Sequence, residues 1–550
     1  MAQSDAQAKL RQATGVAMIS TREWRWVVGW AGAISLLTCL PYLYGWWLST
    51  PQMQFSGFFI GVEDANSYLA KMRQGAEGGW LFHLPYTPEP HQGAYLFSFH
   101  LLLGKLARLG SIPLPLMYHL ARLVFGLGLL LTLYYFISYF TPQVAQRRFA
   151  FLLAAGGSGL GWLVIALQLT PRLGLPLDLY VPEAFIFLVL LHLPHLALAE
   201  TLLFWAVLWT LQSWQTNHWL PILGAACALL GVALIAAFYV GVFVIVLGLT
   251  ALVLTLRGGT MRGTVNLWLK LICAPLLSLP VLLYDAYVFS TNPVLGIWSQ
   301  QNLILSPEPW HYLLAYGPLI LLAVYGGLHL GNSAVTSAPF GRKIELTFLV
   351  VWCLVFPLLV YLPFNLQRRL VVGVQLPLTV LATDGVFYLT NRLRSDRQRW
   401  LRAGLLALFS LTNLALLLGG LVSISLRQPP IFHPASQLEA MRWLDQAANG
   451  EVVLAVYETG NVLPAYANVR AFVGHGPETI HSDEKRAQAQ QFFTAATSDA
   501  WRKALLAKFN VDYVYYGPRE KAAGDFAPAR APYLEEVYNQ GDVQIYAVKR

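Results

Sequence analysis

Long apolar runs separated by short polar connectors fill most of the chain. After a polar start at residues 1–22, the run Trp26–Leu48 is long enough to form a membrane helix, and Pro41 predicts a kink within it. Further apolar runs cover residues 115–140, 149–170, 184–214, 219–235, 236–256, 264–286, 310–330, 344–362, 369–391 and 400–425. The pattern predicts about eleven membrane-spanning helices, and the long run at 184–214 is expected to break near Pro194.

The pattern changes from about residue 434 onward. Helix-like segments, such as Ala435–Ala448 and Asp499–Phe509, alternate there with short β-branched or aromatic runs. The runs are Val452–Tyr457, Val469–Val473, Val511–Tyr516 and Val543–Val548. This alternation predicts a small soluble α/β domain at 434–550, large enough to have its own core.

Composition supports a mainly α membrane protein. The 550 residues are 56% hydrophobic and 12% charged, whereas about a quarter of the residues are charged in soluble proteins. The net charge of +9 is therefore interpreted as a topology signal, and no nucleic-acid partner is expected. The four cysteines all lie in apolar runs without metal-ligand spacing, so no disulfide framework is predicted.

The basic connectors define the expected topology. They fall on the same side as the basic residues of the 1–22 tail only if the segment 94–109 does not cross the membrane. By the positive-inside rule this side is cytoplasmic. The sequence thus predicts a multi-pass protein of the cell membrane, with a cytoplasmic tail at 1–22 and a membrane domain at 23–433. The first loop, 49–114, and the domain at 434–550 are expected outside.

An adjacent acid pair, Glu63-Asp64, stands out in the first external loop. It opens a predicted amphipathic helix on which Asp64, Tyr68 and Lys71 share one face. Acids at the start of a helix are favoured by the helix dipole, so an N-terminal cap is the simpler interpretation. A functional acid is the alternative, since it lies on the predicted outer side of the membrane.

Other candidate residues lie on the same predicted side. Asp178 and Glu183 follow the third predicted helix, where acids close to the bilayer are costly and are often functional. The alternative for this pair is a solvated turn with Glu183 at a helix N-terminus. The glycine-rich stretch Gly156–Gly161 is interpreted as a helix-packing feature without chemistry.

A basic cluster, Gln367-Arg368-Arg369, stands at the outer end of a predicted helix. Paired arginines on this side run against the positive-inside rule, and guanidinium groups match the oxygens of a phosphate. Ordinary snorkelling to the membrane surface is the alternative. Lys71 and Arg122 are weaker phosphate-binding candidates.

These features together resemble the GT-C superfamily of polytopic glycosyltransferases. The resemblance rests on the acid-bearing first loop (VEDANSY), a second external acid segment (LDLYVPEA) and a late soluble domain. It implies a GT-C-like arrangement of the membrane helices. It also implies an enzyme that moves a sugar from a polyprenyl-phosphate donor in the membrane lipid to a glycan, lipid or protein acceptor at the outer face, with inversion.

The resemblance also suggests roles for single residues. Asp64 would be the catalytic base, with Glu63 beside it, and Asp178 and Glu183 would position the acceptor or a metal. Arg368 and Arg369, with Gln367, would hold the leaving phosphate. A divalent cation, Mg or Mn, is possible because some GT-C members need one, but the Glu-Asp order differs from the Asp-Asp or Asp-Glu of several relatives. The competing hypothesis is a lipid-carrier flippase or transporter with an external binding domain.

Overall fold

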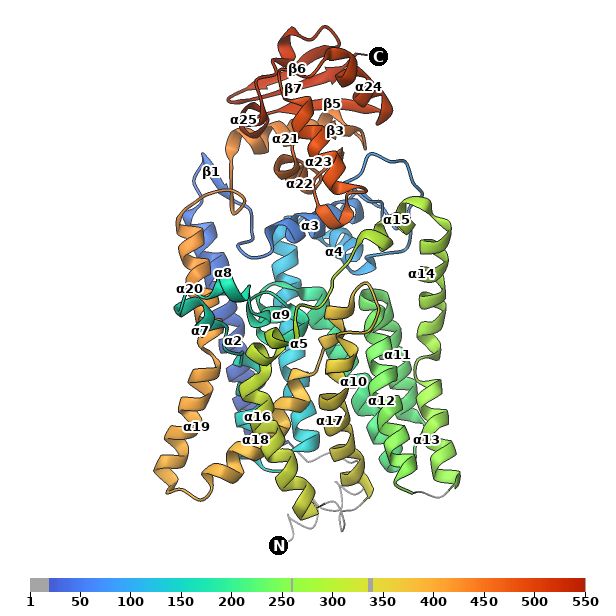
Figure 1. Ribbon diagram of the computed structural model, residues 1–550, viewed down its shortest axis with the longest axis vertical. Helices are drawn as coiled ribbons and strands as arrows, with labels where there is room; N and C mark the ends of the chain where they lie inside the picture. Colours follow the sequence, from blue (N-terminus) through green and yellow to red (C-terminus); the bar gives the residue numbers. More distant parts are fainter. Residues whose placement is uncertain (1–18, 259–260, 335–339, 550) are drawn as a thin grey trace. The chain divides into compact units, whose positions relative to one another are not determined.

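The computed structural model describes residues 19–258, 261–334 and 340–549. The helices are α2 Thr21–Leu48, α3 Val62–Ala76, α4 Ser98–Leu109, α5 Leu114–Phe140, α6 Val144–Gly156, α7 Gly161–Ala166, α8 Thr170–Leu173, α9 Ile186–His192, α10 Pro194–Thr216, α11 Leu220–Ala236, α12 Phe238–Leu256, α13 Met261–Cys273, α14 Leu279–Thr291, α15 Pro293–Gln301, α16 Pro309–Ala334, α17 Phe340–Leu359, α18 Gln375–Thr390, α19 Ser395–Phe409, α20 Leu411–Ser425, α21 Ala435–Ala447, α22 Tyr457–Tyr466, α23 Ser482–Phe492, α24 Asp499–Lys508 and α25 Pro518–Ala523 (Figure 1). The strands are β1 Met53–Phe55, β2 Phe432–Pro434, β3 Val452–Leu454, β4 Arg470–Ala471, β5 Val511–Tyr516, β6 Leu534–Gln540 and β7 Val543–Val548.

The chain forms two compact units. The first unit contains residues 1–39, 121–283 and 304–419, and the second contains residues 40–120, 284–303 and 420–550. The second unit therefore combines the first predicted external loop with the C-terminal region. Several long helices, including α2 and α5, run from one unit into the other.

Apolar helices make up most of the first unit. Among the described residues of the whole chain, seven helical segments are long and apolar enough to cross a membrane, and the bent pair α19 and α20 could supply an eighth. The seven are Thr21–Leu48, Leu114–Phe140, Pro194–Thr216, Phe238–Leu256, Met261–Thr291, Pro309–His329 and Gln367–Thr390. The multi-pass membrane protein that the sequence predicts is thus present, with fewer spans by this criterion than the predicted eleven.

One predicted span is lost to a break, and another, 219–235, corresponds to α11, which has 17 residues and is just too short for this criterion. The predicted span at 149–170 is interrupted between α6, which ends at Gly156, and α7, which begins at Gly161. At Gly159 a Cβ atom would lie 2.2 Å from the carbonyl oxygen of Ala315, so this loop packs too closely for a side chain. The glycine-rich stretch therefore serves close packing, as predicted, but it does so in a loop and not within a helix.

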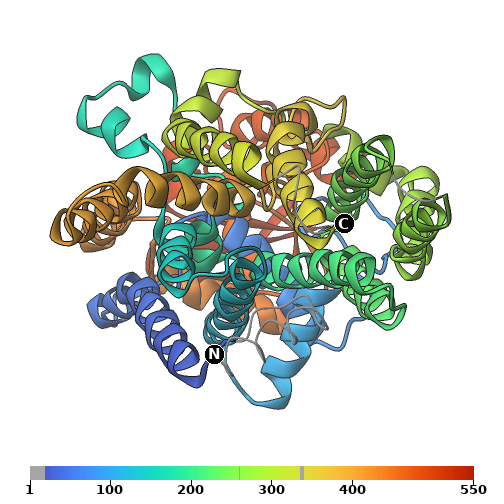
Figure 2. The same cartoon turned by 90° about the horizontal axis from the view of Figure 1, so that it is seen from below.

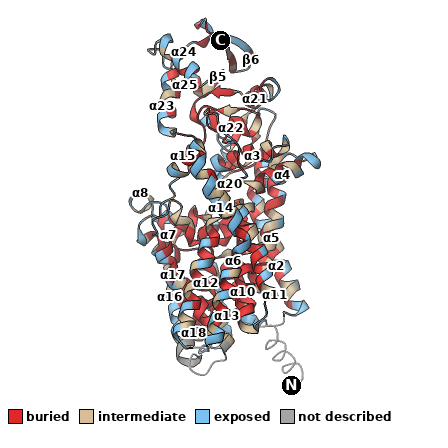
Figure 3. Ribbon diagram, turned by 90° about the vertical axis from the view of Figure 1, so that its right-hand side faces the viewer, coloured by how far each residue is buried: buried red, intermediate tan, exposed pale blue. Residues whose placement is uncertain are grey.

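The predicted break near Pro194 is confirmed. Helix α9 ends at His192, and α10 starts at Pro194, the first helical position, where the missing N–H of proline costs no hydrogen bond. Helix α10 then packs along α11, while α16 packs along α18 (Figure 2). Buried residues line α10 and α12 along their length (Figure 3).

The C-terminal part of the second unit contains the predicted α/β fold. Its sheet has the strand order β4-β3-β5-β7-β6, with β4, β3 and β5 parallel and β7 and β6 antiparallel to their neighbours. Apolar cores lie against the sheet, one including Val452, Phe472 and Val514 and another including Leu444, Val453 and Ile545. The small sheet domain expected from the sequence is therefore present.

Helices α3 and α4 of the second unit pack against each other unusually closely. A Cβ atom on Gly75 would meet the carbonyl oxygen of Leu101 at 2.0 Å, and one on Gly104 would meet that of Met72 at 1.8 Å. Only glycine permits this contact. Helix α4 has 12 residues, too few to cross a bilayer, which takes about 20. This length agrees with the predicted non-spanning segment 94–109.

Candidate functional site

The acid pair occupies the first turn of α3. The N-cap residue is Gly61, in the left-handed conformation with φ 57°, and it makes no side-chain capping bond. Asp64 is therefore not the N-cap, and its carboxylate is 61% exposed. The helix dipole favours a negative charge in this first turn, so the simpler, structural interpretation still accounts for the position of the acid pair.

A histidine from the C-terminal region contacts Asp64. The Nε2 atom of His475 lies 2.9 Å from Oδ1 of Asp64, and the His475 side chain is only 7% exposed. Because the carboxylate can only accept, Nε2 carries the proton in this contact. The buried imidazole thus donates to an exposed acid and fixes the direction of its carboxylate.

A buried ion pair lies next to the other ring nitrogen of this histidine. Nζ of Lys71 lies 2.6 Å from Oε1 of Glu478, with side chains 1% and 6% exposed, and Ser67 donates to the same oxygen at 2.7 Å. Oε1 of Glu478 also lies 3.7 Å from Nδ1 of His475. Burial raises the pKa of Glu478, but the nearby charges of Lys71 and His475 outweigh it and hold that pKa below its usual value. Glu478 therefore stays ionised.

Helix α22 holds the start of α3 from another side. Tyr457 donates from its hydroxyl to Oε2 of Glu63 at 3.2 Å, and burial raises the pKa of this tyrosine. Asn66 donates to Oδ1 of Asn461 at 2.8 Å, and Asn461 donates to the backbone oxygen of Glu63 at 3.3 Å. Helix α3 thus packs against both α4 and α22.

His475, Glu478 and Tyr457 were not predicted from the sequence, unlike Asp64 and Glu63. One signal was available for the first two. They follow the apolar run Val469–Val473, and polar residues just after a parallel strand lie at the edge where α/β folds bind ligands.

The basic cluster lies in the first unit, on a short 3-10 helix, Gln367–Val371. Nε of Arg369 pairs with Oε1 of Glu183 at 3.3 Å, and Glu183 is buried. The guanidinium of Arg368 lies 5.2 Å from the ring centre of Tyr180, and its buried Nε atom has no hydrogen-bond partner among the described residues. Arg368, Arg369 and Glu183 thus form one group, with Arg368 as its unsatisfied donor.

Gln367 has a supporting position beside this group. Its Oε1 accepts from the backbone N–H of Ser306 at 3.0 Å, and its Nε2 donates to the oxygen of Leu362 at 3.2 Å. The backbone N–H of Arg368 donates to the oxygen of Ile304 at 3.2 Å. The amide of Gln367 therefore ties the loop before α16 to the turn that carries the arginines.

Three other candidate residues have roles inside the protein. Oδ2 of Asp178 accepts the backbone N–H groups of Gly159 and Gly161, each at 3.0 Å, and burial raises the pKa of this carboxyl. Arg122 donates to the hydroxyl of Thr38 and to the oxygen of Leu190, and Lys71 pairs with Glu478. These contacts account for their placement, so we leave Asp178, Arg122 and Lys71 out of the proposed site.

A divalent cation does not fit the described residues as they are arranged. No group of three or more His, Cys, Asp or Glu side chains that could hold a metal occurs in the described ranges. Near the acid pair, Asp64 contacts an imidazole and Glu63 contacts a phenol hydroxyl, where Mg²⁺ would need several oxygen ligands. We therefore derive no step through a metal.

Comparisons with known proteins identify the fold. No family model and no curated protein sequence matches this chain. Among solved structures, arabinofuranosyltransferase AftD from Mycobacteria is similar with a TM-score of 0.54 and 18% identity, over 97% of this chain and 42% of AftD. ArnT from Cupriavidus metallidurans is similar with a TM-score of 0.51 and 13% identity, over 94% of this chain and 98% of ArnT. The predicted GT-C fold is thereby confirmed, while identities this low show the fold alone.

Proposed function

We propose that this protein is a membrane glycosyltransferase that moves a sugar from a polyprenyl-phosphate donor to a glycan, lipid or protein acceptor. The GT-C fold, shared with an arabinofuranosyltransferase, supports the reaction class. The observation that carries the proposal is Asp64, an exposed carboxylate at the first turn of α3 held by a buried imidazole.

In the proposed reaction Asp64 is the general base. The acceptor's hydroxyl or amide attacks the anomeric carbon of the donor sugar, and its proton passes to the Asp64 carboxylate. The new bond to the anomeric carbon forms as the bond from that carbon to the phosphate oxygen breaks. Polyprenyl phosphate leaves with the bonding electrons, and attack from the opposite face inverts the configuration.

His475 is the positioning residue in this proposal. Its Nε2–H donates to Asp64, so the carboxylate keeps one orientation while its exposed side receives the acceptor. The ring itself is held between Glu478 and Tyr86, whose ring centre lies 5.7 Å from that of the imidazole. Such orientation lowers the entropy that the reacting groups lose on reaching the transition state.

The arginine cluster is the proposed site for the donor's phosphate. Negative charge grows on the leaving phosphate, and a guanidinium held ready for it stabilises the transition state. Arg368 is the stronger candidate, because its buried Nε has no protein acceptor among the described residues. Glu183 orients Arg369 through their ion pair. In this proposal Glu183 acts through Arg369 and does not contact the acceptor.

The experiment compares Asp64→Asn with Glu63→Gln in membranes supplied with a panel of radiolabelled polyprenyl-phosphate sugars. Asparagine keeps the shape and accepts the imidazole hydrogen bond, but it cannot take up the proton. We expect release of polyprenyl phosphate to fall by about two to four orders of magnitude in Asp64→Asn. Glu63→Gln keeps an acceptor for Tyr457 and is expected to lose much less.

Two outcomes would count against the proposal. Near-normal turnover in Asp64→Asn would remove Asp64 as the base. Movement of the intact donor across the bilayer, without cleavage by the wild-type protein, would favour the flippase or transporter hypothesis. Equal expression and equal gel-filtration profiles of the two variants are the control for folding.

A further inference from the structure

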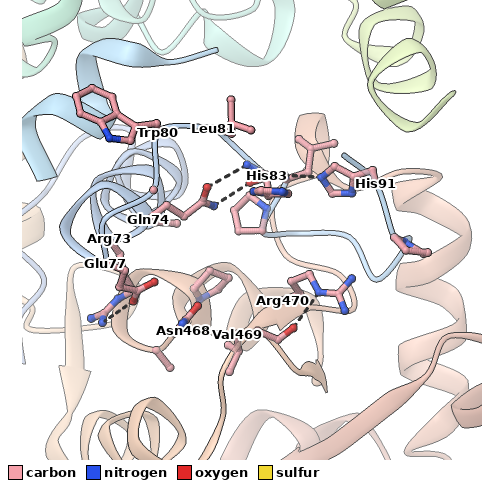
Figure 4. A pocket seen from close by; sticks show the side chains of 18 residues that line it. Arg73, Gln74, Glu77, Trp80, Leu81, His83, His91, Asn468, Val469 and Arg470 are labelled. Atoms are coloured by element: carbon pink, nitrogen blue, oxygen red, sulfur yellow. Dashed lines mark hydrogen bonds and ion pairs between the residues drawn. The ribbon is translucent and has the colours of Figure 1, made fainter. Parts of the chain in front are cut away.

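A pocket in the second unit has no role in the proposed transfer. Its volume is about 600 Å³, within the usual range for small-molecule sites. It lies between the C-terminal half of α3 with the following loop on one side and the end of α22 with β4 on the other (Figure 4). The polar and aromatic residues around it are Arg73, Gln74, Glu77, Trp80, His83, His91, Asn468 and Arg470.

Arg470 supplies a fixed positive charge at one end of the pocket. Its Nε donates to the oxygen of Gly450 and its Nη1 to the oxygen of Pro88, both at 3.0 Å. No carboxylate in the described part of the chain forms an ion pair with it. The two carbonyls therefore hold the guanidinium in place without neutralising it, and donors on Nη2 remain for a ligand.

The two histidines nearby do not add charge. Burial lowers the pKa of His91, and its ring is committed at both nitrogens, since Nε2 accepts from the N–H of Leu84 and Nδ1 lies 2.9 Å from the oxygen of Glu89. Burial and the charge of Arg470 lower the pKa of His83. Gln74 clamps the backbone of His83 with two hydrogen bonds, at 2.8 and 3.0 Å (Figure 4).

The other end of the pocket offers a flat aromatic surface. Trp80 is 62% exposed. Nζ of Lys105 lies 4.2 Å from its ring centre, and that ammonium also donates to the oxygen of Gly78 at 2.9 Å. The indole is thus fixed by a cation against its ring. Arg73 is balanced by Asp445 at 3.0 Å and by Glu77 at 3.8 Å, so this end carries no excess positive charge.

We propose that this pocket binds a saccharide that carries a carboxylate or phosphate group. The anionic group would pair with Arg470, whose planar fork matches both kinds of oxyanion. The sugar ring would lie against the exposed indole of Trp80, where its C–H groups meet the aromatic face. Asn468, whose Nδ2 donates to Asn449, offers its Oδ1 to a sugar hydroxyl.

The binding test uses the full-length protein in lipid nanodiscs and measures affinities by saturation-transfer NMR. The probes are methyl β-D-glucuronide, glucose 6-phosphate, the neutral methyl β-D-glucoside and inorganic phosphate. We expect at least one anionic sugar to bind about tenfold more tightly than the glucoside, the scale of one charge-assisted contact. A preference for the glucuronide or for the phosphate sugar identifies which anion the pocket takes.

Matched variants locate the binding. Arg470→Gln is expected to remove the preference for the anionic sugar, whereas Arg530→Gln, at an exposed arginine of the same unit outside the pocket, keeps it. Trp80→Ala should weaken all three sugars by a similar factor and leave inorganic phosphate unchanged. Since Trp80 is largely exposed, this variant keeps the test valid even if Arg470→Gln fails to fold.

Three results would overturn the proposal. They are equal affinity for the glucoside and both anionic sugars, an unchanged preference in folded Arg470→Gln, and inorganic phosphate binding as tightly as glucose 6-phosphate with no effect of Trp80→Ala. Binding is measured without turnover. Failure of this proposal is therefore separate from failure of Asp64 as a catalytic base.

Discussion

The buried ion pair between Lys71 and Glu478 makes the sharpest prediction about stability. It lies behind His475, with Nζ and Oε1 2.6 Å apart and both side chains almost completely buried. Removal of one partner leaves the other charge without compensation inside the protein. We therefore expect Lys71→Met and Glu478→Gln each to lower the free energy of unfolding by about 3–5 kcal/mol, the usual cost of breaking a buried pair.

The double variant tests whether the cost belongs to the pair. With both charges removed, no uncompensated ion remains, so Lys71→Met/Glu478→Gln should be more stable than the sum of the single variants predicts. The control is Glu535→Gln, because Glu535 and Lys549 are 4.0 Å apart and mostly exposed. A pair of that kind contributes little, so its loss should leave stability nearly unchanged.

The measurement is the guanidinium concentration at which half of the second unit is unfolded. It is made on the full-length protein in one detergent, with pulse proteolysis to detect the unfolded fraction. The pH dependence gives an independent check. Because the pKa of Glu478 is held below its usual value of 4.5, its contribution is present above that pH and is lost as the pH falls through the folded-state pKa. Additive single variants, or single effects below about 1 kcal/mol, would show that the pair is not the coupled unit described.

Three further predictions concern other regions. Burial lowers the pKa of His433 to about 4, so the folded protein favours the neutral imidazole. Between pH 6.5 and pH 4 the wild-type protein should therefore lose about 3 kcal/mol of its free energy of unfolding, and His433→Phe should lose less. Arg368→Ala should raise the KM for the polyprenyl-phosphate sugar more than Arg369→Lys does, and equal wild-type kinetics in both would mean ordinary snorkelling. A cysteine at the exposed Gln92 should react with an impermeant maleimide from outside, while one at Ser395 should be protected; the reverse pattern would invert the topology.

The C-terminal sheet shows how far local pattern predicts structure. The runs Val511–Tyr516 and Val543–Val548 are strands with the predicted bounds, because β-branched and aromatic residues fill buried positions there. Strand β6 was missed. It lies at the edge of the sheet and carries Glu535 and Glu536. Charged residues prevent an edge strand from pairing with other chains. They also interrupt the apolar run from which a strand is predicted in the sequence.

The membrane region shows where pattern misleads. An apolar stretch at 149–170 has the composition of one span, yet the chain leaves the helix after Gly156. The loop that follows is fixed by the carboxylate of Asp178, which accepts the N–H groups of Gly159 and Gly161. That carboxylate satisfies backbone donors that a continuous helix would have satisfied itself. Composition cannot reveal such a break, since the partner is a side chain from another segment.

Helix α3 shows how tertiary packing separates two residues of one helical face. Helical spacing places Asp64 and Lys71 on the same face, and spacing alone gives no reason for their exposure to differ. In the structure Asp64 is 61% exposed and Lys71 only 1%. The segment that carries His475 and Glu478 covers the second half of that face and leaves its first turn open. The buried lysine pairs with Glu478, the buried histidine lies between that acid and Asp64, and only Asp64 reaches solvent. One face of one helix thus contributes both the anchor of the cluster and its exposed, proposed catalytic acid.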